Sequence, residues 1–162
     1  MTEKLTVEDV EKKVNDTFAG VASSIGFSPI HGKIIGALLV GGRSMPLQKL
    51  AKKTGYSSSM ISLSLDLLEL LNVIKKVKKS ADRKLYVELN SNLLETLKNV
   101  LVLRIKRNVS DSMEEFENSR KRLEGIQSEN KDKVINGIEI LENEIKRLHS
   151  YIELLDKIKL PG

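Results

Sequence analysis

Six cationic side chains lie within ten consecutive positions near the middle of the chain. They are Lys75, Lys76, Lys78, Lys79, Arg83 and Lys84. Ammonium and guanidinium groups at this density suit a row of phosphates, because each one that contacts a phosphate releases a bound counterion. A charge run by itself is more often a solvated face. Its meaning therefore depends on the elements that carry it.

The basic run falls on an expected β-hairpin. Alternating side chains near 73–79 and 84–89 predict two short strands, joined by the polar residues of 80–83. Arg83 at the tip is the best single candidate for bridging phosphates or entering a minor groove, since its planar guanidinium is pre-organised. Asp82 beside it either orients that guanidinium or simply forms the turn.

A helix-turn-helix pattern directly precedes this hairpin. Pro46 is expected to start one helix, which Gly55 ends. Ser57 is expected to cap a second helix that runs to about Leu71, with Asn72 as its left-handed stop. The second helix has an inward apolar face at Ile61, Leu65, Leu68 and Leu71. In such a module the second helix enters the major groove of DNA, where its N-terminal residues meet base edges and phosphates.

The outward face of that second helix supplies the other candidate contacts. They are Ser57, Ser58, Ser59, Met60, Ser62, Leu63 and Asp66. Small hydroxyl residues at a helix N-terminus allow close approach of a phosphate to the free N–H groups. The face lacks Arg, Asn and Gln, which make bidentate base contacts. Leu63 and Leu67 either contact thymine methyl groups or pack against another element. Serines that are merely solvated are the plainer interpretation.

Three elements are expected before the helix-turn-helix. Thr6, with Asp9 in the capping-box position, predicts the start of a first helix that stops at Gly26. Its apolar stripe consists of Val7, Val10, Val14, Phe18, Val21 and Ile25. A second helix should run from Ser28-Pro29 to Gly41-Gly42, and a short strand is expected at Met45.

The C-terminal part predicts two long helices. Apolar residues from Leu94 to Ile126 indicate one helix, in which we expect an interruption or a bend. A heptad seam follows at Val134, Ile138, Leu141, Ile145, Leu148, Ile152 and Leu155. This seam is typical of a coiled coil, and we expect it to mediate dimerisation. Helices of roughly thirty residues reach about 45 Å, so they must pack against each other or against a second copy of the chain.

Charge and composition narrow the function. Residues 1–90 hold 14 Lys and Arg against 9 Asp and Glu, a net +5, whereas residues 91–162 hold 13 against 13. This asymmetry favours separate binding and assembly regions.

The chain has no Cys, and His31 and His149 lack neighbours at metal-ligand spacing. We expect a non-enzymatic protein without metal or cofactor. No signal peptide or membrane span is visible, so a soluble, cytoplasmic protein is expected.

The segment from Met45 to Glu88 resembles the winged helix-turn-helix of MarR-type transcriptional regulators. The run PLQKLAKKTGYSSSMISLSLDLLELLNVIKKV, followed by ADRKLYVEL, resembles their GbsR-like branch, related to repressors of glycine-betaine synthesis. The preceding GFSPIHGKIIGALLVGGRSMPL fits that branch too. Its matching positions are Gly26, Pro29, Gly32, Ile34 and Leu38. The resemblance spans about residues 10–90.

The resemblance implies a fold, a division of the chain and a function. The fold is mainly α with a small β-hairpin wing and long C-terminal dimerisation helices. The expected parts are an N-terminal dimerisation helix (1–27), a winged helix-turn-helix (28–90) and a helical coiled-coil region (91–162). The implied function is a homodimeric regulator, a repressor, that binds double-stranded DNA at a palindromic operator. A small effector is implied, but no particular ligand is predicted. The alternative is a non-catalytic protein-protein interaction module.

Overall fold

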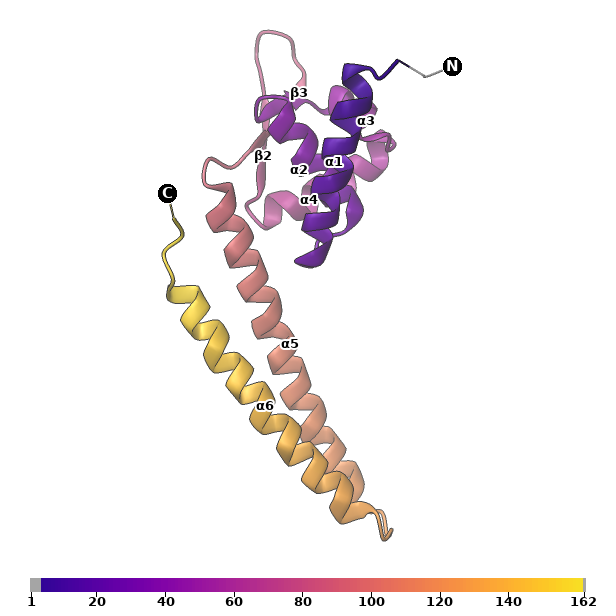
Figure 1. Cartoon of the computed structure of the whole chain (residues 1–162), viewed down its shortest axis with the longest axis vertical. Helices are drawn as coiled ribbons and strands as arrows, with labels where there is room; N and C mark the ends of the chain where they lie inside the picture. The colour runs from indigo at the N-terminus through magenta and orange to yellow at the C-terminus, as the bar shows by residue number, and fades with distance from the viewer. Residues whose placement is uncertain (1–3, 162) are drawn as a thin grey trace. The chain divides into compact units, whose positions relative to one another are not determined.

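The computed structural model describes residues 4–161 and contains six helices and one small sheet within that range (Figure 1). The elements are α1 (Val7–Ser24), α2 (Pro29–Val40), β1 (Ser44–Pro46), α3 (Leu47–Thr54), α4 (Ser58–Leu70), β2 (Ile74–Lys78), β3 (Leu85–Leu89), α5 (Leu93–Glu124) and α6 (Lys131–Lys157). The mainly helical fold with a small wing and long C-terminal helices is confirmed.

The described chain forms two compact units, one ending at Leu97 and one starting at Lys98. The first unit holds α1 to β3, and the second holds most of α5 and all of α6. The functional division expected from the sequence, at 1–27, 28–90 and 91–162, stays a prediction. Residues 1–3 and 162 of those ranges lie outside the described residues.

The start of α1 is fixed by the predicted capping box. The Thr6 side chain accepts a hydrogen bond from the Asp9 N–H at 3.2 Å, and the Asp9 carboxylate accepts one from the Thr6 N–H at 2.8 Å. These bonds satisfy two N–H groups that a helix start leaves without a partner. Hydrogen bonds from Thr6 also lower the pKa of the Asp9 carboxyl.

Small residues hold α1 against α2. Asn15, Ala19 and Ala22 of α1 are buried, and Gly32 of α2 lies so close that an added Cβ would stand 2.6 Å from the Ala19 Cα. At Gly36 the added Cβ would stand 3.2 Å from the Asn15 amide oxygen. Close approach of two helix backbones therefore requires glycine here. The small face of α1 makes the contact, and its larger valines are left exposed.

The core of the first unit is mainly aliphatic, in keeping with a chain that has three Phe, three Tyr and no Trp. Its fully buried large side chains are Ile34, Ile35, Leu38, Leu50, Ile61, Leu65, Leu68, Val73 and Val87. This set contains three of the four residues expected on the inward face of the second helix of the helix-turn-helix. Leu71, the fourth, is half-buried and forms the C-cap of α4. The predicted inward face of α4 is therefore correct.

The three-stranded antiparallel sheet links the wing to the helices. Its strand order is β1-β3-β2, with Met45 and Lys76 paired to Val87 from opposite sides. The predicted stops are present, since Gly55 has φ of 76° and Asn72 of 59°. Both lie in the left-handed region that Gly and Asn adopt most readily. These turns set the direction in which α4 and the wing leave the core.

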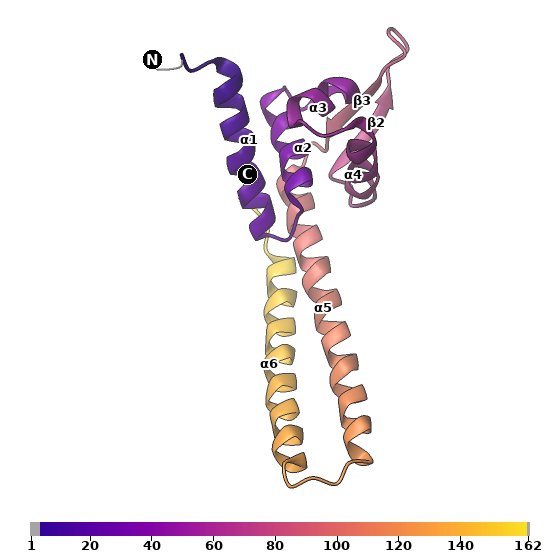
Figure 2. The same ribbon diagram turned by 90° about the vertical axis from the view of Figure 1, so that its right-hand side faces the viewer.

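The second unit is an antiparallel pair of helices (Figures 1 and 2). We expected an interruption or a bend in the first long helix. It has no interruption, because α5 is continuous over 32 residues. Its sequence contains neither Gly nor Pro, the residues that most often break a helix. The second helix, α6, has 27 residues. Among residues 4–161, no helix is long and apolar enough to cross a bilayer.

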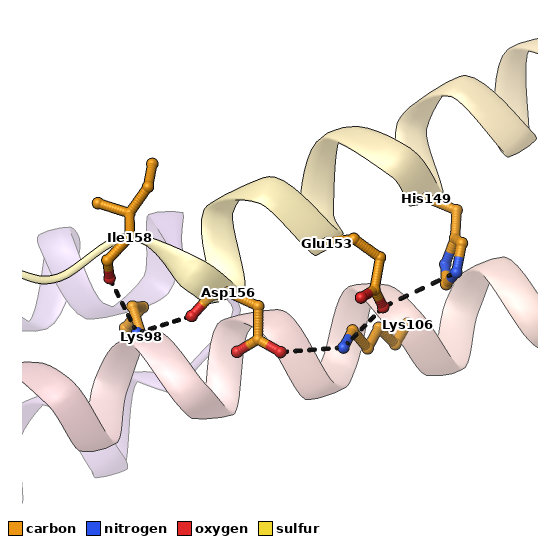
Figure 3. Close-up of polar contacts among 6 residues, drawn as sticks. All are labelled: Lys98, Lys106, His149, Glu153, Asp156 and Ile158. Atoms are coloured by element: carbon orange, nitrogen blue, oxygen red, sulfur yellow. Dashed lines mark hydrogen bonds and ion pairs between the residues drawn. The ribbon is translucent and has the colours of Figure 1, made fainter.

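Ion pairs join α5 to α6 along their length. Arg120 lies 2.6 Å from Glu142, and Lys106 lies 2.9 Å from Glu153 and 3.1 Å from Asp156 (Figure 3). Hydrogen bonds from Lys106 lower the pKa of the Glu153 carboxyl, and the bond from Arg120 lowers that of Glu142. Lys106 and Arg120 are thus paired within this helical hairpin.

Candidate nucleic-acid interface

The N-terminal end of α4 is exposed and well defined. Ser57 is its N-cap, with a side chain that accepts a hydrogen bond from the Met60 N–H at 3.3 Å. The side chains of Ser58 and Ser59 are exposed, and neither has a hydrogen bond among the described residues beyond the helix backbone. Free N–H groups at a helix start, flanked by small hydroxyls, suit an approaching phosphate. The structure places these serines where the sequence predicts.

The outward face of α4 carries two stripes side by side. One is polar and contains Ser58, Ser59, Ser62, Asp66 and Glu69, all exposed. The other is apolar and contains Met60, Leu63, Leu67 and Leu70, with exposed fractions of 48%, 73%, 42% and 81%. We call this second set the apolar stripe. Leu70 was not among the contacts predicted from the sequence, although its spacing from Met60, Leu63 and Leu67 follows the helical repeat.

The two carboxylates of the polar stripe are bound by a lysine of the wing. Lys76 Nζ lies 2.5 Å from an Asp66 oxygen and 3.1 Å from Glu69 Oε2. The Lys76 backbone N–H also donates to Glu69 at 3.1 Å. The hydrogen bond that the Lys76 ammonium group donates to Asp66 and, after it, the one to Glu69 raise the pKa of Lys76. Lys76 therefore cancels negative charge on α4, a role that sequence reasoning did not assign to it.

The other wing cations fall into two groups. Lys75 and Lys79 lie 3.3 and 3.9 Å from Glu88 of β3, and Lys79 also lies 4.1 Å from the centre of the Tyr86 ring. The remaining cations, Lys78, Arg83 and Lys84, are exposed and have no ion pair within residues 4–161. We call these three the free wing cations. They are the groups of the wing best able to accept an external anion.

The tip of the wing is built by Asp82. Its carboxylate accepts a hydrogen bond from the Lys84 N–H at 3.1 Å and another from the Tyr86 hydroxyl at 2.9 Å. These bonds, the first being the larger cause, lower the pKa of the Asp82 carboxyl. Arg83 sits in the turn with φ of 55°. Asp82 thus forms the turn, and the wing projects beyond the helices of its unit (Figure 2).

The described residues offer little support for other chemistry. No group of three or more His, Cys, Asp or Glu within residues 4–161 could hold a metal ion. His31 lies 2.9 Å from the Ser28 hydroxyl, and His149 lies 3.8 Å from Glu153. A hollow of about 490 Å³ between α1, α2 and α3 is lined by charges of both signs, some of which pair across it, as Lys33 does with Asp16.

Comparison with known proteins supports the fold. The chain is similar to a crystal structure of a transcriptional regulator, with a TM-score of 0.52 and 17% identity over 90% of this chain and 99% of that one. AbsC, a MarR family transcriptional regulator from Streptomyces coelicolor, gives 0.44 and 18% over 90% and 99%. An E. coli MarR C80S mutant complexed with operator DNA gives 0.42 and 12% over 57% and 64%.

No family model and no curated protein matches the sequence. Identities this low establish the fold and nothing further. The fold, a winged helix-turn-helix followed by long C-terminal helices, is shared with the first of these structures.

Proposed function

We propose that this protein is a sequence-specific double-stranded DNA-binding transcriptional regulator of the GbsR-like branch. One observation carries the proposal. The free wing cations and the exposed, hydroxyl-rich start of α4 belong to one compact unit with a winged helix-turn-helix fold. In that fold the second helix of the motif enters the major groove, and a basic wing beside it meets the phosphates.

The charge on α4 supports the same proposal. A helix with two carboxylates on its outward face repels phosphates, unless the carboxylates are neutralised. Lys76 holds both Asp66 and Glu69. Lys76 therefore reduces the charge of this face from −2 to −1, and the wing beside it is positive, which fits a base-reading surface next to a phosphate-binding one.

The protein is proposed to act as a homodimer. In α1, Val7, Val10, Val14 and Val21 form an exposed row. In α6, the predicted seam divides between two faces. Ile138 and Ile152 are buried in the helical hairpin, whereas Val134, Leu141 and Leu148 keep 47%, 53% and 41% of their surface exposed. The buried residues of the seam thus pack within the helical hairpin, and the exposed ones are proposed to pack against a second copy of the chain.

A dimer explains how a long site is read. Two copies of α4 facing successive major grooves would lie about 34 Å apart, one turn of the duplex. A palindromic operator is the expected target, and repression by occupancy the expected mode of action. We expect the protein to bind its DNA in the cytoplasm. A non-catalytic role without a cofactor is expected, and no effector is assigned.

Affinity for a random-sequence duplex, measured over a range of salt concentrations, tests this function. If about eight phosphates are contacted per dimer, the slope of log affinity against log salt should lie near −7. A slope shallower than about −3 would contradict the wing contacts. Arg83→Ala should weaken binding to most sequences, and Lys106→Ala, in the helical hairpin, should not.

The alternative is a protein-protein interaction module built on the same fold. The apolar stripe of α4 favours it, since exposed leucines commonly mark a docking surface. The free wing cations favour DNA. A chain that binds no duplex at low salt, yet remains folded and oligomeric, would support the module.

A further inference from the structure

We infer that Leu63 and Leu67, in the apolar stripe of α4, contact thymine methyl groups in the major groove and so determine sequence specificity. The inference rests on the proposed DNA-binding function and names what that surface recognises. Its starting point is exposure. Leu63 has 73% of its surface exposed and Leu67 has 42%, on a helix whose opposite face is fully buried.

The chemistry of the groove limits what leucines can recognise. Base edges in the major groove present hydrogen-bond donors, acceptors and one apolar group, the C5 methyl of thymine. Nothing on the outward face of α4 can make the bidentate contacts of Arg, Asn or Gln, because its residues there are Ser, Met, Leu and the two carboxylates held by Lys76. Apolar contact with methyl groups is the discriminating contact that remains, and Ser62 can hydrogen-bond to any base.

The length of the apolar stripe fits contact with a few consecutive base pairs. Met60 and Leu67 are separated by seven residues, or about 10 Å of helix, which covers about three base-pair steps at 3.4 Å each. Leu70 lies a further turn along, at the last residue of α4. Base contacts in helix-turn-helix modules come mainly from the N-terminal part of this helix. Leu70 is therefore a natural control with the same side chain on the same stripe.

Duplex DNA is favoured over a protein partner by the charge that the same unit carries. Lys78, Arg83 and Lys84 are exposed without ion pairs in the described chain. The wing contacts α4 through the polar stripe, where Lys76 pairs with Asp66 and Glu69, and the apolar stripe lies next to that polar stripe. An exposed apolar stripe on a unit with a cationic wing fits a methyl-bearing groove bounded by phosphates.

Uracil in place of thymine tests the inference, because it removes the methyl group and leaves base pairing intact. Duplexes selected from a random pool at moderate salt would be resynthesised with deoxyuridine at every thymidine. Burial of one methyl group favours binding about fourfold. A dimer that uses one methyl in each half-site should therefore bind the thymine duplex on the order of tenfold more tightly than the uracil duplex.

Matched variants locate the effect. The double variant Leu63→Ala/Leu67→Ala should bind the two duplexes equally, and Leu70→Ala should keep the native ratio. Alanine preserves helix propensity at these exposed positions, and circular dichroism checks the fold. Equal binding of both duplexes by the native protein would overturn the inference, and so would a ratio unchanged in the double variant. Failure to bind any duplex at low salt would instead remove the proposed function itself.

Discussion

The molecule contains two charged hairpins that use their charge in opposite ways. In the α5–α6 hairpin, Lys106 and Arg120 are paired with carboxylates of the facing helix. In the β2–β3 wing, Lys78, Arg83 and Lys84 have no ion pair within the described chain. Similar residue types therefore serve internal stability in one hairpin and remain available to an external anion in the other.

Pairing, and not residue type, distinguishes the cations within the wing. The six wing cations look equivalent in the sequence, yet Lys76 is bound to two carboxylates of α4. Cations that already have partners gain less from a phosphate, since they must first give those partners up. The free wing cations should thus carry most of the salt-dependent affinity.

The largest expected effect comes from removing all three free wing cations. The variant Lys78→Ala/Arg83→Ala/Lys84→Ala should bind random duplex at least about a hundredfold more weakly at 0.15 M salt, because each lost phosphate contact costs several-fold there. The salt slope of a dimer should fall by about 5 if six contacts disappear. Fluorescence anisotropy over a salt series measures both.

A matched triple variant in the other hairpin serves as the control. Lys106→Ala/Lys121→Ala/Lys146→Ala removes the same number of positive charges from the second unit. Its salt slope should stay at the native value. Equal losses in the two triple variants would show that net charge, and not the wing, governs binding.

A smaller effect is expected at Lys76. Lys76→Ala exposes Asp66 and Glu69 to the phosphates, and we expect binding about tenfold weaker through like-charge repulsion. Adding Asp66→Asn and Glu69→Gln should restore affinity, with the salt slope unchanged throughout. If Lys76 itself held a phosphate, those additions would not rescue binding, and the slope of a dimer would fall by about 2.

Local patterns in the sequence predicted the fold well. The capping box at Thr6, the left-handed stop at Asn72 and the inward face of α4 follow from residue types at fixed spacing. These features depend on neighbours along the chain. The continuous course of α5 was not predicted, although no Gly or Pro lies within it.

The candidate site was predicted only in outline. The sequence identifies the basic wing and the outward residues of α4, but not which cations are already paired. Whether Lys76 meets Asp66 depends on how β2 lies against α4, a tertiary contact that no local pattern encodes. The division of the α6 seam between Ile138 and Leu141 likewise depends on where α5 packs.

Removing the ion pair between Arg120 and Glu142 should destabilise the protein more than removing the pair between Arg122 and Glu115. Glu142 is buried, with 8% of its surface exposed, and Arg120 is its partner. Arg120→Ala leaves a buried carboxylate without its partner and should lower the melting temperature. Arg122→Ala removes a pair between exposed side chains, with Glu115 at 3.3 Å, and should change it little. An equal fall of the melting temperature in both variants would show that burial of the carboxylate does not set the strength of these ion pairs.

The smallest predicted effect is a dependence of stability on pH that belongs to the helical hairpin. The pKa values of Glu142 and Glu153 are lowered from the ordinary 4.5 by hydrogen bonds from Arg120 and Lys106. Carboxylates with a lowered folded-state pKa contribute stability that is present in full above the unfolded value. That contribution should begin to fall below about pH 4.5 and be lost once the pH drops through the folded-state pKa.

Urea unfolding at pH 7 and at a series of values below 4.5 measures this dependence. The variant Glu142→Gln/Glu153→Gln should be less stable at pH 7 and should lose less stability on acidification than the native protein. An acid dependence that Glu142→Gln/Glu153→Gln leaves untouched would place the titrating carboxylates outside the helical hairpin, and the contrast between the two hairpins would then rest on DNA binding alone.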